Sequence, residues 1–483
     1  MNAQLPTTIE AQCQGPLING HWRRTASHID VTNPASGTRL ASVASANASD
    51  TLDAIEAAEQ SLPAWWEAGA SRRSAVLRDW YDAIVTSRDD LAQTLTLEQG
   101  KPLSEALAEI DYAASYVLWF SQEAMRTTGA TLSIDNTGLR DTTSMKPIGV
   151  CAAITPWNFP AAMITRKVAP SLAAGCSMVI KPSELTPLTA LALGALALDA
   201  GVPAGVFNVV PGEASLIGHV LTSDSRVRKL SFTGSTGVGR KLMADCASTV
   251  KRLSLELGGN APFIVFPDAD IPAAVKGAID SKFRNAGQTC ICANRFLVHE
   301  DISDTFCDQL IDAAGSLNVG SGLAPGTDIG PLINEAAVQK VENWIELAVA
   351  QGARVRLGGA RARPGSNFFT PTVLDRVSPL AKCLQMEIFG PVAPITTFKT
   401  EDEAINLANS TEYGLAAYVY TSHSARQWRF GDALDVGMLG INTGSLSNAA
   451  APFGGVKQSG FGREGGREGI EEYLTPQYRR FAL

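Results

Sequence analysis

The sequence predicts an α/β fold made of two open, mainly parallel sheets and one projecting hairpin. Short apolar strands recur roughly every 25–30 residues with helical patterns between them, which is typical of βαβ units. The composition breaks at Leu257-Gly-Gly-Asn260, between two such series of strands. A polar, threonine-rich stretch at 129–147 interrupts the alternation and predicts an extended hairpin.

The first half of the chain is expected to carry a helical layer and the first sheet. Asn19-Gly20 indicates a tight hairpin, and Asp50 is expected to cap the first helix. Apolar periodicity predicts further helices over 71–87, 104–125 and 186–200. The strands of the first sheet are expected at 150–157, 177–181, 206–210 and 229–233.

The second half is expected to carry the second sheet and to end in a strand. The tail, 471–483, alternates polar and apolar residues and can pair with the 129–147 hairpin, whose turn is expected at Asn136-Thr-Gly138. That hairpin is either a plain surface feature or an exchange element between subunits. The strands of this half are expected at 261–266, 293–299, 392–398, 416–421 and 438–442, and its helices at 271–285, 303–317 and 335–351.

Length and composition restrict the class of protein. The 483 residues suffice for two or three domains, and a net charge of −8 without a basic run predicts no nucleic-acid partner. Eight scattered cysteines predict no disulfide scaffold, and the absence of ligand spacing predicts no metal site. The N-terminus lacks a secretory apolar region, and the most apolar segment, 188–198, is about half the length that spans a bilayer. We expect a soluble, cytoplasmic protein.

Cys290 lies in the stretch that draws most attention. It follows Gly287-Gln-Thr and precedes the strand expected at 293–299. A single cysteine is more often a small buried hydrophobe than a nucleophile. Other polar groups, each at the end of a predicted strand, shift the balance toward chemistry.

Two of these groups suit acid–base and oxyanion chemistry. Glu256 stands between leucines, and burial would raise the pKa of its carboxyl group and favour general-base work. Asn158, in Thr155-Pro-Trp-Asn-Phe-Pro160, can offer an amide N–H to a developing oxyanion. The plainer interpretations are a solvent-facing carboxylate and an ordinary turn residue.

Two further stretches suit a nucleotide. Phe232-Thr-Gly-Ser-Thr-Gly-Val-Gly239 places a glycine turn before a helix, where backbone N–H groups can approach a phosphate. Its glycine spacing differs from the usual dinucleotide fingerprint, so a simple tight turn is the alternative. Ile180-Lys-Pro-Ser-Glu184 ends another strand, where a carboxylate can bind ribose hydroxyls and repel a 2′-phosphate, or simply face solvent. Cysteine, carboxylate, amide and phosphate turn together form the set needed to oxidise an aldehyde through a thioester.

These residues resemble the aldehyde dehydrogenase superfamily nearly end to end. Beyond the stretches already quoted, the resemblance rests on Leu255-Glu-Leu-Gly-Gly259, Glu387-Ile-Phe-Gly-Pro391 and Pro452-Phe-Gly-Gly455. It implies that Cys290 is the nucleophile, that Glu256 is the general base, and that Asn158 and the Cys290 N–H form the oxyanion hole. It also implies NAD as cofactor, with NADP possible, held by Trp157, Lys181, Ser183, Glu184, Gly234, Ser235, Glu387 and Phe389.

The resemblance implies an architecture as well. The family fold has two Rossmann-like open-sheet domains and a β-hairpin that joins subunits into homodimers or homotetramers. On this chain it implies an NAD(P)-binding domain over 1–128 and 147–257, a catalytic domain over 258–447, and bridging segments over 129–146 and 471–483.

A narrower resemblance is to the succinate-semialdehyde and glutarate-semialdehyde dehydrogenases. It rests on Met163-Ile-Thr-Arg-Lys167, on the stretch from Lys282 to Arg295 and on Asn442-Thr-Gly-Ser-Leu-Ser-Asn448. It implies that the substrate's far carboxylate is bound by Arg166, Arg284 and Ser447. Guanidinium groups suit a carboxylate through paired hydrogen bonds, although either Arg could instead form a plain ion pair.

One residue stays open at this point, and the sequence argues against three rival functions. Cys292 could pair with Cys290 as a redox switch or be a small packed residue, and an i,i+2 disulfide needs a bent loop. A CoA-acylating dehydrogenase would not need Glu256, and a non-catalytic binding protein would not keep the whole set of polar groups. A cysteine hydrolase would need a His partner, and the five histidines lie outside the motifs.

Overall fold

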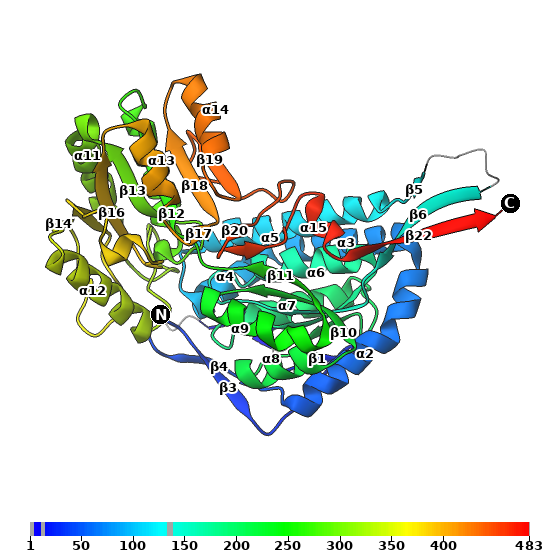
Figure 1. The fold of residues 1–483 in the computed structure, drawn as a ribbon. Helices are drawn as coiled ribbons and strands as arrows, with labels where there is room; N and C mark the ends of the chain where they lie inside the picture. The colour runs from blue at the N-terminus through cyan, green and yellow to red at the C-terminus, as the bar shows by residue number, and fades with distance from the viewer. Residues whose placement is uncertain (1–3, 11–14, 133–138, 483) are drawn as a thin grey trace.

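The computed structural model describes residues 4–10, 15–132 and 139–482. Its first sheet has eight strands in the order β2-β1-β9-β8-β7-β10-β11-β21, and the five strands from β9 to β11 run parallel (Figure 1). The β1–β2 hairpin turns at Asn19 and Gly20, both with positive φ, as the sequence predicts. The strands are β1 (Leu17–Ile18), β2 (His21–Trp22), β7 (Val150–Ile154), β8 (Ser177–Lys181), β9 (Phe207–Val209), β10 (Val227–Thr233), β11 (Arg252–Glu256) and β21 (Gly460–Phe461).

Apolar layers cover both faces of this sheet. Along β7, Cys151 and Ala153 belong to one buried apolar cluster, whereas Val150, Ala152 and Ile154 belong to another. This alternation is what a strand buried on both faces requires. The helices of this half are α2 (Ala48–Glu67), α3 (Gly69–Thr86), α4 (Arg88–Gln99), α5 (Leu103–Glu123), α6 (Ala162–Ala174), α7 (Leu188–Asp199), α8 (Ala214–Ser223) and α9 (Thr236–Cys246).

Two details of the helical layer differ from the sequence prediction. Asn47, not Asp50, caps α2, because Asn47 Oδ1 accepts the Asp50 N–H at 3.0 Å. Asp50 is the third residue of the helix, and its carboxylate accepts the Asn47 N–H at 2.9 Å, which completes a capping box. The second difference is helix α4, which the sequence analysis does not predict.

One strand of the first sheet also differs from the prediction. β7 ends at Ile154 rather than at residue 157, since the following Pro156 has no N–H for the ladder.

The second sheet has seven strands in the order β14-β15-β16-β13-β12-β18-β19. The chain passes from the first sheet to the second between Glu256, where β11 ends, and Ala261, where β12 begins. The elements are β12 (Ala261–Val265), β13 (Ala293–His299), β14 (Arg354–Leu357), β15 (Thr372–Asp375), β16 (Val392–Phe398), β18 (Ala416–Tyr420), β19 (Met438–Ile441), α10 (Ile271–Lys282), α11 (Ser303–Gly315), α12 (Glu335–Ala350), α13 (Glu401–Asn409) and α14 (Ser424–Ala433).

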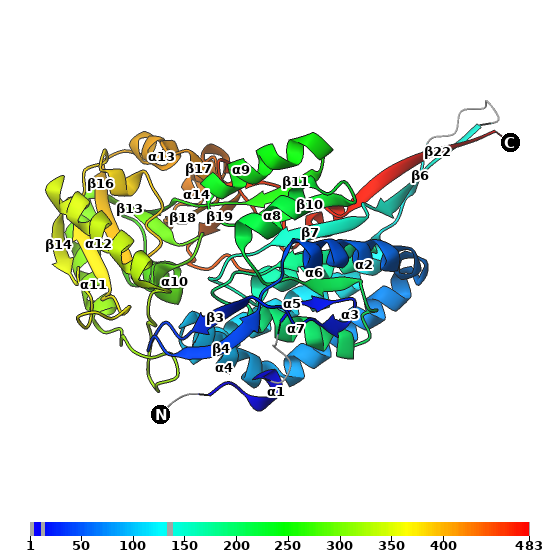
Figure 2. The same ribbon diagram turned by 90° about the horizontal axis from the view of Figure 1, so that it is seen from below.

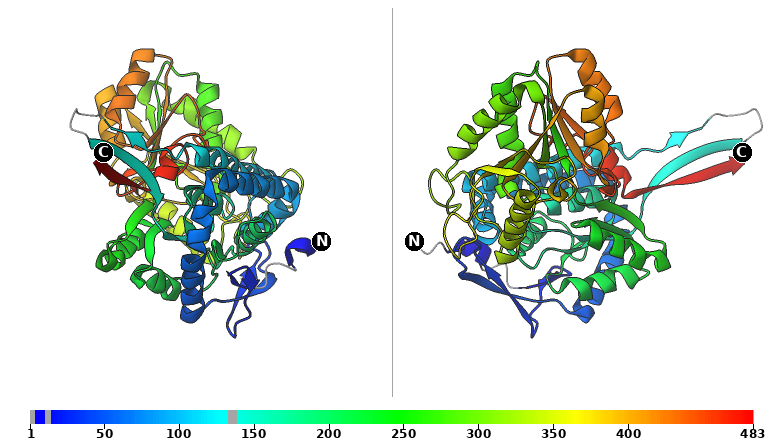
Figure 3. Two further views of the ribbon diagram at one scale, coloured as in Figure 1. Left: turned by 90° about the vertical axis from the view of Figure 1, so that its right-hand side faces the viewer. Right: turned by 60° about the vertical axis from the view of Figure 1, so that its left-hand side comes forward.

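A three-stranded arm projects from the body, at the side away from the second sheet (Figures 1 and 2). It contains β5 (Ala130–Thr131), β6 (Leu139–Pro147) and the C-terminal β22 (Leu474–Ala482). β22 pairs with β6 in an unbroken antiparallel register, which confirms the predicted pairing of tail and hairpin (Figure 3). The predicted turn at Asn136-Thr-Gly138 lies outside the described residues. No helix among residues 4–10, 15–132 and 139–482 is long and apolar enough to cross a membrane.

Candidate active site

The parallel strands of the first sheet bring four predicted stretches to one edge. β7, β8, β10 and β11 are neighbours in the sheet and point the same way, so their carboxyl ends lie together. Asn158 follows β7, Lys181 ends β8, Ser235 follows β10 and Glu256 ends β11. Ligands of open α/β sheets bind at this edge.

The turn before Cys290 has an unusual backbone. Asn285, Ala286 and Gly287 all have positive φ, at 53°, 54° and 73°. A side chain at position 287 would place its Cβ 2.2 Å from the Gly390 carbonyl oxygen, so only glycine fits there. The residues that follow, up to β13, carry Cys290 to the junction of two cavities.

Cys290 is half-buried and lies close to the segment after β11. A Cβ at Gly259 would lie 2.1 Å from the Cys290 carbonyl oxygen, so the glycine lets the two backbone segments approach closely. Burial raises the pKa of the Cys290 thiol to about 12, and the charge of Arg166 opposes this shift. Burial therefore favours the protonated thiol over the thiolate at this position.

Asn158 is held by both its side chain and its backbone. Its Nδ2 donates to the Gln288 carbonyl at 3.0 Å. Its own carbonyl accepts hydrogen bonds from Lys101 Nζ and Asn285 Nδ2, each at 2.9 Å. An amide nitrogen has two hydrogens, so Asn158, which lines one cavity with Cys290, has a second Nδ2 hydrogen left to donate.

Glu256 is a buried carboxylate, as its apolar neighbours predict. It is 3% exposed, and neither carboxylate oxygen has a hydrogen-bond partner in the described part of the chain. Burial, and next the charge of Glu464, hold the pKa of Glu256 well above its usual range. The side chain lines neither cavity at Cys290 and lies against Gly454, where a Cβ would approach its Oε1 to 2.8 Å.

The first cavity at Cys290 opens along the edge of the first sheet and has a volume of about 230 Å³. Trp157 and Phe389 meet edge-to-face across it, with ring centroids 5.6 Å apart. Glu387 accepts the Gly259 N–H at 3.1 Å, and burial raises the pKa of Glu387 to about 7. The predicted site residues that line this cavity are Trp157, Asn158, Gly234, Ser235, Cys290, Glu387 and Phe389.

The residues that could receive a nucleotide divide into two groups. Ser235 is the N-cap of the 11-residue helix α9, so backbone N–H groups of that helix face a phosphate position beside the cavity. Lys181, Ser183 and Glu184 do not line the cavity. Lys181 Nζ lies 2.7 Å from Glu184 Oε2, and Ser183 Oγ accepts the Leu185 N–H at 3.2 Å.

The second cavity at Cys290 is small, about 10 Å³, and cationic. The structure brings the three residues of the predicted carboxylate site together in its wall with the thiol. The wall consists of Tyr112, Phe159, Ala162, Met163, Arg166, Arg284, Thr289, Cys290, Ile291, Ser447 and Phe453.

The two arginines of this cavity differ. Arg166 is 2% exposed and forms a buried ion pair with Glu464, to which its Nε donates at 2.5 Å. Lys167 contacts the other oxygen of Glu464. Arg284 lies over the Phe159 ring at 5.1 Å and has no carboxylate oxygen within 4.0 Å among the described residues.

Sequence reasoning missed several residues of the site. Tyr112 lines the second cavity, and its hydroxyl oxygen lies 2.5 Å from that of Tyr116. Glu464 does not line the cavity but accepts a hydrogen bond from Arg166, which does. Lys101, on the turn between α4 and α5, reaches the Asn158 carbonyl. The sequence offers only a weak signal for two of these residues, namely that each is a charged residue beside glycine. Lys101 lies in Gln99-Gly-Lys-Pro102, and Glu464 lies in the glycine-rich stretch near the C-terminus.

Cys292 is 5% exposed, and its Sγ faces the Lys282 carbonyl at 3.6 Å. All seven cysteines in the described ranges are free, so no bond joins it to Cys290 here. The redox switch stays a prediction. Within those same ranges, no group of three or more His, Cys, Asp and Glu side chains could hold a metal ion.

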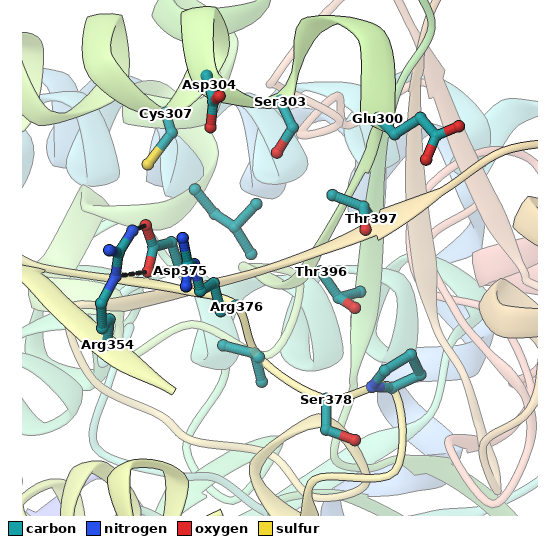
Figure 4. A pocket seen from close by; sticks show the side chains of 13 residues that line it. Glu300, Ser303, Asp304, Cys307, Arg354, Asp375, Arg376, Ser378, Thr396 and Thr397 are labelled. Atoms are coloured by element: carbon teal, nitrogen blue, oxygen red, sulfur yellow. Dashed lines mark hydrogen bonds and ion pairs between the residues drawn. The ribbon is translucent and has the colours of Figure 1, made fainter. Parts of the chain in front are cut away.

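A further cavity of about 460 Å³ lies in the second half of the chain, between α11 and the strands β15 and β16 (Figure 4). Arg354 and Asp375 form an ion pair in its wall, at 2.6 Å. None of its lining residues is a predicted site residue, and none lines either cavity at Cys290.

Fold and site together define a two-sheet α/β enzyme with a thiol where two cavities meet. The family model described as "Aldehyde dehydrogenase family" matches residues 22–478, and the chain belongs to this family. It is 55% identical to the succinate-semialdehyde dehydrogenase [NADP(+)] of Escherichia coli (strain K12) over 97% of this chain and 98% of that one. It is 52% identical to a glutarate-semialdehyde dehydrogenase of Pseudomonas putida over 96% of this chain and 97% of that one. The crystal structure of succinate-semialdehyde dehydrogenase from Burkholderia pseudomallei matches with a TM-score of 0.98 at 52% identity, covering 100% of each chain.

Proposed function

We propose that this aldehyde dehydrogenase oxidises a short aldehyde with a carboxylate at its far end, succinate semialdehyde first and glutarate semialdehyde as the alternative. The observation that carries the proposal is Arg284, whose guanidinium lies in one small cavity with the Cys290 thiol. Arg284 forms no contact ion pair within the described ranges, and its charge acts on the Glu105 carboxyl only from a distance. The similar proteins from Escherichia coli and Pseudomonas putida bear these two activities in their names. One methylene changes binding by only about 1–3 kcal/mol, so both chain lengths remain candidates.

In the proposed mechanism, the Cys290 thiol gives its proton to water and Sγ attacks the aldehyde carbon to form a thiohemiacetal. Loss of a hydride from this adduct to the dinucleotide would leave the thioester. The Nδ2 of Asn158 and the backbone N–H of Cys290 stabilise the negative charge that develops on the oxygen. Glu256, in its ionised form, takes a proton from the water that hydrolyses the thioester, which requires its side chain to turn from Gly454 toward Cys290. Arg166, Arg284 and Ser447 hold the carboxylate, so that the carbonyl carbon is presented to the thiol.

We propose NAD as the cofactor, with NADP possible. The group accepts a hydride when bound. The helix end at Gly234 and Ser235 suits its phosphates, and Trp157, Glu387 and Phe389 line the cavity that leads to Cys290. Lys181, Ser183 and Glu184 would take the adenosine ribose. Pairing with Lys181 weakens the repulsion that Glu184 exerts on a 2′-phosphate, which leaves room for NADP.

We propose the following organisation on the same basis. The NAD(P)-binding domain comprises 1–128 and 147–257, the catalytic domain 258–447, and the bridging segments 129–146 and 471–483. Its support is that β7 to β11 share one sheet, whereas β12 to β16, β18 and β19 share the other. The arm joins subunits into a homodimer or homotetramer, since β22 exposes Tyr478 and Phe481. Free cysteines support a reducing, cytoplasmic location.

Initial rates across a panel of aldehydes test the proposal. Succinate semialdehyde, glutarate semialdehyde and butanal would each be measured with NAD and with NADP. We expect kcat/KM for a semialdehyde to exceed that for butanal by about 100-fold, because butanal lacks the carboxylate that the arginines bind. Equal values for butanal and both semialdehydes would refute the carboxylate site.

We also propose that Cys290 and Cys292 form a reversible disulfide under peroxide. The expected result is inactivation that a dithiol reverses in the wild type but not in Cys292→Ala, whose Cys290 oxidises further. If peroxide inactivates both proteins alike and a dithiol restores neither, Cys292 is a packed residue.

A further inference from the structure

A buried charged pair lies behind the oxyanion amide. Lys101 and Glu109 side chains are each 1% exposed, and Lys101 Nζ lies 2.5 Å from Glu109 Oε2. The same Nζ donates to the Asn158 carbonyl at 2.9 Å and lies 3.9 Å from the centre of the Phe159 ring. An ammonium group this deeply buried is tolerated only with such partners, so it is confined to one position.

The pair fixes both sides of the turn that carries Asn158. On one side, Lys101 and Asn285 share the Asn158 carbonyl, which sets the plane of that peptide. On the other side, Glu109 Oε1 accepts the N–H groups of Ala161 at 2.9 Å and Ala162 at 3.3 Å, where α6 begins. The Asn158 side chain leaves the backbone between these anchors.

The α4–α5 turn, which carries Lys101, and the first turn of α5 also hold the segment that leads to Cys290. Gln99 Nε2 donates to Asn285 Oδ1 at 2.9 Å, and Gln99 Oε1 accepts the Lys101 N–H at 3.0 Å. Glu105 Oε2 accepts the Asn285 N–H at 2.8 Å. Asn285 has a φ of 53°, a conformation that persists only where its surroundings impose it.

We propose that Lys101 and Glu109 are positioning residues that set the Asn158 amide relative to Cys290 Sγ and thereby determine the strength of the oxyanion hole. This inference rests on the proposed function, in which Asn158 Nδ2 binds the oxyanion. Neither residue lines a cavity at Cys290, so neither touches the substrate. Their effect on the reaction passes through Asn158.

Two reactions of the Cys290 thiol separate this role from general support of the fold. With p-nitrophenyl acetate, Sγ attacks the ester carbonyl, the oxygen becomes an oxyanion, and nitrophenolate leaves as the carbonyl re-forms. With iodoacetamide, Sγ displaces iodide from a saturated carbon, and no oxyanion forms. Only the first reaction needs the Asn158 amide in place.

The variant to compare is Lys101→Met/Glu109→Gln, which removes both charges and leaves neither one buried alone. We expect acylation by p-nitrophenyl acetate to slow about 10- to 100-fold, and kcat for the semialdehyde to fall in parallel. Alkylation by iodoacetamide and the KM for the semialdehyde should stay within about 2-fold. A parallel slowing of acylation and alkylation would show a structural role alone and overturn the proposal.

Asn158→Ala provides the reference. We expect it to show the same pattern, and adding it to Lys101→Met/Glu109→Gln should slow acylation no further, because the two changes act through one amide. If Asn158→Ala slows acylation and the double variant does not, the inference about Lys101 fails while the oxyanion role of Asn158 stands. If Asn158→Ala acylates at the normal rate, the oxyanion role fails and this inference with it.

Discussion

The two cavities that meet at Cys290 are built in different ways. The larger one, about 230 Å³, is walled by turns that follow strands of the first sheet and by the Glu387–Phe389 loop. The smaller one, about 10 Å³, is walled by helices and by the 447–453 loop, and it contains two guanidinium groups. The first offers a helix end and aromatic rings, which suit a nucleotide, and the second offers concentrated positive charge, which suits a small anion.

The difference teaches where specificity resides in this fold. The sheet places the turns of the larger cavity at the ends of its strands, and the Lys101–Glu109 pair, which lines neither cavity, holds the turn that carries Asn158. The smaller cavity depends on an ion pair, since Arg166 keeps its place through Glu464. Substitutions in the two cavities should therefore fail in different ways, and five predictions test this from the largest effect to the smallest.

Cys290 belongs to both cavities, and its loss should remove the reaction without emptying either of them. For Cys290→Ala we expect a fall in kcat of at least about 10,000-fold, because no other group forms the thioester. The Kd for the dinucleotide, measured by quenching of tryptophan fluorescence, should change less than about 3-fold. Cys292→Ala is the matched control and should keep most of its activity. Residual turnover above about one hundredth of the wild-type rate would mean that another nucleophile acts.

Glu464→Gln should damage the smaller cavity through stability. The change leaves Arg166 and Lys167 buried without their carboxylate, which typically costs about 3–5 kcal/mol in the free energy of unfolding. Glu342→Gln, at an ion pair with Arg361 nearer the surface, is the control and should cost less than about 1 kcal/mol. Urea unfolding of both variants at pH 7 gives the comparison.

The pH dependence of unfolding gives a second measure of the same pair. Arg166 and Lys167 hold the pKa of Glu464 down to about 2, below the value of about 4.3 in an unfolded chain. A lowered carboxyl pKa contributes stability above the unfolded value, and that contribution is lost as the pH falls from about 5 toward 2. The wild type should lose more stability than Glu464→Gln over that range. Parallel curves for the two proteins would argue against the ion pair.

Arg284→Ala should damage the smaller cavity through recognition. A hydrogen bond to a charged group is worth about 1.5–3 kcal/mol, so KM for succinate semialdehyde should rise about 10- to 150-fold. KM for butanal, which has no carboxylate, should stay within about 2-fold. Arg284→Lys keeps the charge but not the planar fork and should fall between the two. A similar rise in KM for both aldehydes would show that Arg284 maintains the fold of the loop and does not bind the carboxylate.

The larger cavity could be anticipated from the sequence because its parts are local. Each stretch, such as Thr155-Pro-Trp-Asn-Phe-Pro160, follows a strand that its own composition predicts, and parallel strands bring their ends together by rule. The three members of the carboxylate site could be anticipated only through family resemblance. Their convergence depends on how α6, the turn at 284–287 and the 442–448 loop pack.

The ion pair that supports the smaller cavity could not be anticipated. Glu464 and Arg166 are 298 positions apart, and neither neighbourhood carries a pattern that marks the other. Lys101 and Asn158 are 57 positions apart, and their contact likewise has no pattern in the sequence that marks it. At shorter range, Asn47 and Asp50 are both good caps, and only the geometry of the capping box decides that the helix begins at Ala48.

The smallest effect is expected at Glu184, at the far end of the nucleotide site. Lys181 Nζ lies 2.7 Å from its carboxylate, so the negative charge that a 2′-phosphate would meet is already partly balanced. For Glu184→Gln we expect the ratio of kcat/KM with NADP to that with NAD to rise about 3- to 10-fold, since the repulsion disappears and Lys181 is released to the phosphate. The Km for succinate semialdehyde should not change, because the substitution lies outside the cationic cavity. An unchanged cofactor ratio would mean that Lys181 alone decides between the two cofactors, and Lys181→Met would then lower kcat/KM with NADP more than that with NAD.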